Sequence, residues 1–135
     1  MDVASAKKLL DILIENALRI LSAGFGVDSA ESSFFDIVGL LRREIALKGY
    51  FLEKVHTMFS MPDPGRLDAG MVPKEIIELV AHELRWNELR DLADKRIEDY
   101  FRGDAARAIG DIAHNIAAAY DDNWADREFY ESYRQ

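Results

Sequence analysis

Two pairs of residues have the spacing of metal ligands on a helix. Glu53 and His56 are three residues apart, and Asp111 and His114 repeat that spacing. In four-helix bundles that hold two iron or manganese ions, two helices each supply such an acid–histidine pair, and each of the others supplies one Glu. Candidates for the single positions are Glu15, Glu78 and Glu83. The spacing is therefore compatible with a metal-dependent, di-iron-like bundle enzyme.

The directions of these side chains on a helix argue against that site. At about 100° per residue, Glu53 falls opposite the apolar stripe that contains Phe51 and Val55. The pair at 111 and 114 points away from the apolar stripe of its own helix, formed by Ile109, Ile112 and Ile116. A metal in a bundle core needs inward-facing ligands. We therefore predict no metal and no cofactor, and keep the metal enzyme as an alternative hypothesis.

Other catalytic patterns are incomplete. The chain has no cysteine, which excludes disulfides, thiolate zinc sites and cysteine nucleophiles. His82 and Glu83 begin like a zinc-protease helix, but Trp86 occupies the place of the second histidine. The glycine-rich segment 24–26 follows a predicted helix, whereas a dinucleotide loop follows a strand. No catalytic residue is predicted, and we expect a protein that is not an enzyme.

The charge is strongly negative and unevenly distributed. The formal net charge is −8, with 17 basic and 25 acidic residues. Residues 1–67 carry 8 basic and 9 acidic residues (−1), and residues 68–135 carry 9 and 16 (−7). Direct nucleic-acid binding depends on cations that replace the counterions of phosphate, so we do not expect it. An acidic half instead suits a basic protein partner, although it also serves solubility alone.

The segment after residue 120 combines acids with aromatic residues. Aromatic anchors surrounded by charges are common in protein interfaces. We predict partner contacts from Asp121, Asp122, Trp124, Asp126, Glu128 and Tyr130. In the alternative interpretation, the aromatic residues attach the tail to the domain and the acids stay in solvent.

Helices must position all these residues. Apolar residues recur at spacings of three and four, and no hairpin pattern is present. We predict one all-α domain, residues 1–135, built as a bundle of four to six helices with the tail 121–135 packed on it. The first expected helix spans 3–22. The second begins between residues 28 and 33, ends at about 59 and bends at Gly49. The others span 72–102, about 105–120, and 126–132. The Pro- and Gly-rich segment 61–72 is expected to be the long loop.

The stretch from Val72 to Arg102 is predicted to organise the bundle. Pro73 suits the first position of a helix, where its missing N–H has no cost. One apolar stripe precedes Trp86, and a second stripe, rotated by a third of a turn or more, follows it. A single straight helix would face two ways, so we expect a kink or break near Trp86-Asn87, with Asn87 as the N-cap in the case of a break.

The first predicted helix is apolar beyond one face. Leu9, Ile12, Leu18 and Ile20 extend its main stripe. Such a helix lies at the centre of a bundle or forms a homodimer contact.

The function that fits these features best is protein binding. We expect a small acidic bacterial module, of the immunity or inhibitor type, that binds a basic partner. The alternatives are a homodimeric structural or regulatory protein that uses residues 3–22, and the metal enzyme. No apolar run reaches the length of a membrane span and no signal peptide is recognised, so a cytoplasmic location is expected.

Overall fold

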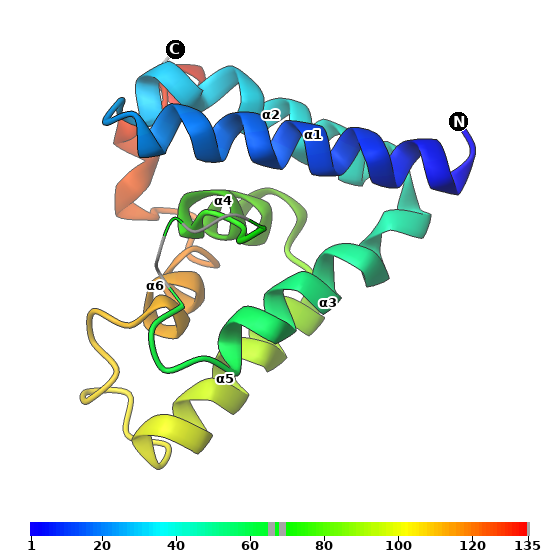
Figure 1. Ribbon diagram of the computed structural model, residues 1–135. Coiled ribbons are helices and arrows are strands. Elements are labelled where there is room, and N and C mark those ends of the chain that lie inside the picture. The colour runs from blue at the N-terminus through cyan, green and yellow to red at the C-terminus, as the bar shows by residue number, and fades with distance from the viewer. Residues whose placement is uncertain (65–66, 68–69, 135) are drawn as a thin grey trace.

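The computed structural model describes residues 1–64, 67 and 70–134, and these residues form no strand. The all-α prediction is confirmed. Six α-helices and three short 3-10 helices follow one another along the described chain (Figure 1): α1 Val3–Ser22, α2 Val27–Arg43, η1 Ile45–Leu47, α3 Lys48–Phe59, α4 Lys74–Leu84, α5 Asn87–Phe101, α6 Ile112–Ala118, η2 Ala125–Phe129 and η3 Glu131–Tyr133. None of these helices combines the length and the apolar character that crossing a bilayer requires.

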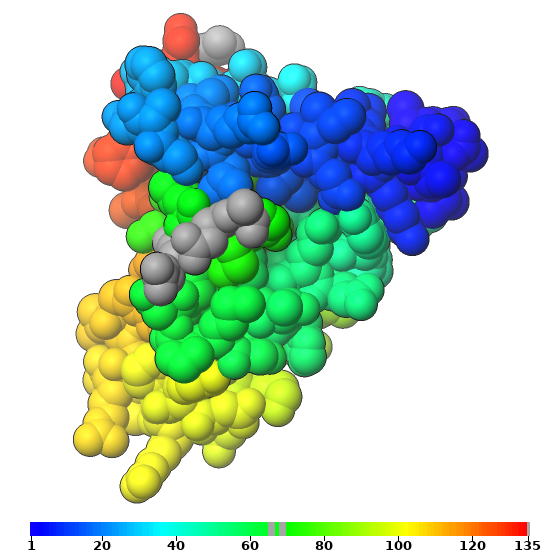
Figure 2. Space-filling view, viewed as in Figure 1, coloured from blue at the N-terminus to red at the C-terminus, as the bar shows by residue number. Residues whose placement is uncertain are grey.

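Helices α1 and α2 form an antiparallel pair along one edge of the molecule (Figures 1 and 2). The predicted bounds of α1, 3–22, match the structure. Asp2 caps the helix by accepting a hydrogen bond from the backbone N–H of Ser5 at 2.8 Å. Helix α1 lies at the outside of the bundle (Figure 1). Of the two predicted alternatives, a central position is therefore wrong, and a homodimer contact stays a prediction.

The run predicted from about 28 to 59 is two helices. We expected a bend at Gly49, but the chain breaks at Glu44, whose φ and ψ are −108° and 80°. The 3-10 turn η1 follows and places Leu47 in the core while Ile45 stays 78% exposed. In an unbroken helix, the side chains of Leu47 and Leu41 would point about 120° apart around the helix axis, because each residue turns by about 100°. The break allows both leucines to be buried.

Helix α4 is the centre of the fold. Seven consecutive residues, from Ile76 to His82, are buried. Helices α2 and α6 both pack against it. The predicted break before α5 is confirmed, because Arg85 adopts the left-handed conformation at φ 55° and ends α4. The cap assignments are corrected: Pro73 and Trp86 precede their helices as cap residues, and Asn87 is the first residue of α5.

The predicted helix 105–120 is mostly wrong. Residues 105–110 form turns, and of the predicted range only Ile112–Ala118 is helical. Gly110 has a φ of 93°, which an α-helix does not accommodate, and Asp111 caps α6 by accepting the N–H of Ala113 at 2.9 Å. Ile109, expected in the core, is 70% exposed.

The C-terminal tail folds back on the bundle and contains the 3-10 helices η2 and η3. Tyr130 is 2% exposed and packs against Phe35 of α2 with ring centroids 5.8 Å apart. The carboxylate of Glu31, also on α2, accepts hydrogen bonds from the N–H of Glu131 at 2.7 Å and the hydroxyl of Ser132 at 2.8 Å. Of the expected 61–72 loop, residues 65–66 and 68–69 lie outside the described residues, as does residue 135.

Candidate functional site

The structure does not bring the proposed metal ligands together. Glu53 and His56 are exposed on α3. Asp111 instead forms a bidentate ion pair with Arg96, with both N–O distances at 2.9 Å. His114 is half-buried on α6. Within the described ranges, no three His, Asp or Glu side chains lie close enough to hold a metal ion.

Arg96 of α5 is buried and forms hydrogen bonds to the end of α3, to the segment after it and to the N-cap of α6. It is 3% exposed, pairs with Asp111, and donates to the carbonyls of Phe59 at 2.9 Å and Met61 at 2.8 Å. Burial alone would favour the neutral form of Asp111, but the hydrogen bonds from Arg96 and from backbone N–H groups lower the pKa of its carboxyl. Asp111 therefore has a structural role at the junction of α5, α6 and the end of α3.

The six predicted partner-binding residues divide into two groups. Asp121, Asp122 and Glu128 are exposed, and Asp126 is half-buried. Asp122 pairs with Arg85 at 2.9 Å, and its side chain remains 91% exposed. The aromatic members are core residues instead, because Trp124 is 6% and Tyr130 is 2% exposed. In this conformation only the four acids are accessible to a partner.

Trp124 is held by a buried histidine. His82 is 5% exposed, and its ring centroid lies 4.9 Å from that of Trp124. The Nδ1 of His82 is 2.7 Å from the carbonyl of Ala119, and its Nε2 contacts the guanidinium of Arg127. Because arginine is only a donor, Nε2 accepts and Nδ1–H donates to the carbonyl. These bonds use both ring nitrogens, and they link His82 of α4 to Ala119 and to Arg127 of the tail.

A cavity of about 440 Å³ lies between α4, α6 and the tail. Three carboxyl groups line it: Glu78, Asp121 and Asp126. Its remaining lining residues are neutral: Asn115, Ala117, Ala118, Asn123, Trp124 and Ala125. Its volume falls in the range of roughly 300–1,000 Å³ that ligand pockets occupy. The cavity thus combines negative charge with room for a ligand.

Glu78 is the deepest acid of this cavity. It is 5% exposed, and no described residue donates a hydrogen bond to it or pairs with it. Burial raises the pKa of its carboxyl from 4.5 to about 8, and the negative charges of Asp126 and Glu75 add to this effect. In the described part of the chain, Oε2 of Glu75 is buried without a hydrogen-bond partner.

Glu78 was predicted as a candidate metal ligand, and its burial beside the tail was not predicted. A signal was present, because apolar residues occupy every side of α4 around it: Ile76, Ile77, Leu79, Val80 and Ala81. A helix that is apolar all round is buried all round. That rule would have placed Glu78 inside the protein.

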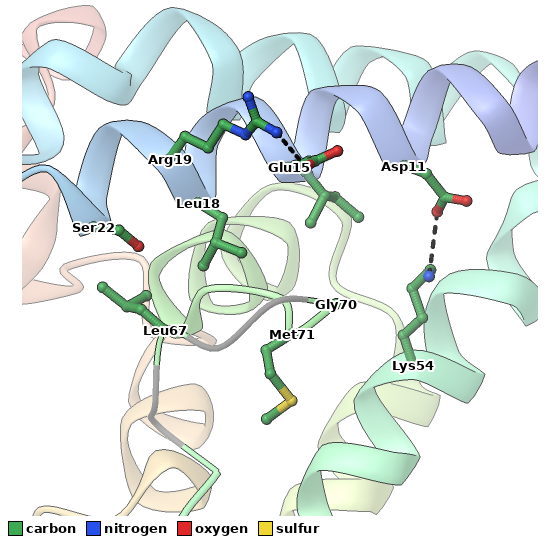
Figure 3. Close-up of a pocket in the computed structure, with 10 residues that line it drawn as sticks. Asp11, Glu15, Leu18, Arg19, Ser22, Lys54, Leu67, Gly70 and Met71 are labelled. Atoms are coloured by element: carbon green, nitrogen blue, oxygen red, sulfur yellow. Dashed lines mark hydrogen bonds and ion pairs between the residues drawn. The ribbon is translucent and has the colours of Figure 1, made fainter.

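A second, larger cavity of about 620 Å³ lies between α1, α3 and the segment that leads into α4 (Figure 3). Its charged side chains are paired with one another. Asp11 bonds Lys54 at 3.2 Å, and Glu15 bonds Arg19 at 2.9 Å. The acidic cavity is therefore the candidate site.

The apolar surplus of α1 is mostly directed inward. Leu18 is 7% exposed, and Leu9 and Ile20 pack partly buried against the core. Ile12 is 62% exposed, and its neighbours Lys8, Asp11 and Glu15 are exposed as well. The outer face of α1 is thus largely charged, and a homodimer through it remains a hypothesis.

No family model, curated protein or solved structure matches this chain.

Proposed function

We propose that this protein is a binding module for a basic segment of another protein, as an immunity or inhibitor protein would be. The observation that supports the proposal is the acidic cavity. Three carboxyl groups line it, and none of its lining residues is basic. Asp122 and Glu128 of the same tail are exposed as well, and Asp122 is paired with Arg85.

Electrostatics favour a cationic ligand there. Carboxylates held near one another repel, and a bound cation relieves that repulsion while gaining charge-assisted hydrogen bonds. The −7 charge of residues 68–135 also attracts a basic partner before contact and raises the association rate at low salt. The lack of cysteine fits a reducing compartment, and the cytoplasm is the proposed location.

The test measures binding of a hexa-arginine peptide by calorimetry and stopped-flow fluorescence at low and moderate salt. We expect the triple variant Asp121→Lys, Asp122→Lys, Asp126→Lys to lower the association rate by about tenfold or more at low salt. The matched control reverses Asp91, Asp94 and Glu98, three exposed acids of α5. It changes the net charge equally and leaves the cavity intact.

The comparison of the two triple variants decides the proposal. If both reversals slow association equally, the peptide responds only to net charge, and the proposal fails. If the tail reversal has the larger effect, pull-down from the native host with and without that reversal then identifies the basic partner.

A further inference from the structure

Glu78 is the most buried of the described acids, and no described residue forms a hydrogen bond or an ion pair with it. It is 95% buried and faces the acidic cavity. Lining residues Ala117, Ala118 and Ala125 have short side chains, which leave the cavity open above it. An ionisable group buried in this way is costly for a folded protein and is typical of functional sites.

We propose that the cavity receives the guanidinium of one arginine from the basic partner, and that Glu78 is the acid at its base that pairs with it. This inference rests on the proposed function, because the arginine is supplied by the partner. It adds a single anchoring residue to what is otherwise a diffuse charged surface.

Several features favour arginine over lysine. Arginine offers five N–H donors in a planar fork and is less strongly hydrated than an ammonium group, so it is preferred in buried ion pairs. The cavity presents acceptors at more than one point, including Glu78, Asp126 and the side-chain amide of Asn115.

Binding through Glu78 must be coupled to a proton. With a pKa of about 8 in the free protein, the carboxyl is mostly protonated at neutral pH. An arginine requires the carboxylate, so binding releases the Glu78 proton to solvent and becomes stronger as pH rises towards 8. The other titratable or charged groups around Glu78 are Lys74 and Glu75 of α4, Asp121, Asp126 of η2, and Tyr130.

The experiment compares hexa-arginine and hexa-lysine binding to the full chain and to Glu78→Gln, from about pH 6 to pH 8.5. The carboxyl carbon signal of Glu78 is followed by NMR in ¹³C-glutamate-labelled protein and assigned by its loss in the variant. We expect hexa-arginine affinity for the native chain to rise by up to about tenfold per pH unit, as release of one proton requires. The affinity of Glu78→Gln should stay flat, and hexa-arginine should lower the midpoint of the Glu78 titration.

A second variant tests the cavity without changing any charge. Ala118→Leu places a larger side chain at the lining of the cavity, at an exposed position of α6. We expect it to reduce hexa-arginine affinity about tenfold at pH 8, which is the effect of losing one anchoring contact. Unchanged affinity in this variant would overturn the assignment.

The remaining outcomes separate this inference from the proposed function. Binding that depends on the three tail aspartates, but has the same pH profile in the native chain and in Glu78→Gln, overturns the arginine pocket and leaves the acidic surface. An equal response to hexa-lysine overturns the choice of arginine. Absence of peptide binding at every pH overturns both proposals.

Discussion

Replacing Glu78 with Gln should stabilise the protein, and the gain should grow with pH. In the unfolded chain the carboxyl titrates near 4.5, whereas burial raises its pKa in the folded state to about 8. Between these values the folded state keeps a proton that the unfolded state has lost. Stability therefore falls as pH rises from about 4.5 to about 8, and it levels off above that range.

The magnitude follows from the two pKa values. Each pKa unit is worth about 1.4 kcal/mol, so the full displacement corresponds to roughly 5 kcal/mol. Gln is of similar shape and carries no proton to lose, and the variant should escape this cost. The difference in unfolding free energy between Glu78→Gln and the native chain should be below ~1 kcal/mol near pH 4.5, about 3 kcal/mol at pH 7 and about 5 kcal/mol at pH 9.

Urea unfolding followed by far-UV circular dichroism at those three pH values measures the effect. Glu128→Gln is the matched control, since it makes the same chemical change at an exposed position, in the C-terminal tail. The control should shift stability by no more than about 0.5 kcal/mol at any pH. Parallel pH profiles for Glu78→Gln and the native chain, or a variant less stable at pH 9, would refute the account of Glu78.

Two further predictions concern the packing around the site. Arg96→Met should lower the free energy of unfolding in urea by about 3–5 kcal/mol, because it leaves Asp111 and two backbone carbonyls without their buried donor. A loss below about 1 kcal/mol would contradict the structural role of Arg96. Tyr130→Ala should also cost about 3–5 kcal/mol, whereas Phe129→Ala should cost less than about 1 kcal/mol, because the first ring is 2% and the second 55% exposed. Equal losses in thermal or urea unfolding would show that the tail is not anchored through Tyr130.

The parts of the fold that were predicted from the sequence have local causes. The bounds of α1 follow from a capping acid and from the glycines after it. The break before α5 follows from two apolar stripes that no single helix satisfies. The break at Glu44 has no such signal, since neither Gly nor Pro stands there. It exists because Leu47 is buried against residues distant in sequence, and a tertiary contact of this kind cannot be read from local propensity.

Asp111 shows how a local signal can be misread. An acid three residues before a histidine has the spacing of a metal pair, and the same acid just before a helix is a cap. The cap also explains why the alanine-rich segment before Asp111 is not part of α6. Gly110 has a positive φ and Asp111 is the N-cap, so the helix begins at Ile112. Asp111 also forms an ion pair with Arg96, which is fifteen residues away in sequence. This contact is visible only in the folded structure, and it shows that Asp111 has a structural role.

The acidic cavity was not predicted as a site because its members come from three separate places in the chain. Asp121 and Asp126 were identified from composition, but Glu78 joins them only through the packing of α4 against α6 and the tail. A loss of several kcal/mol at one buried acid is large beside the ~5–15 kcal/mol by which proteins are usually stable. A hydrophobic side chain of similar volume would avoid that loss. Retaining a carboxyl there makes physical sense if a cation reaches it, because the bound charge then offsets the cost that the free protein bears.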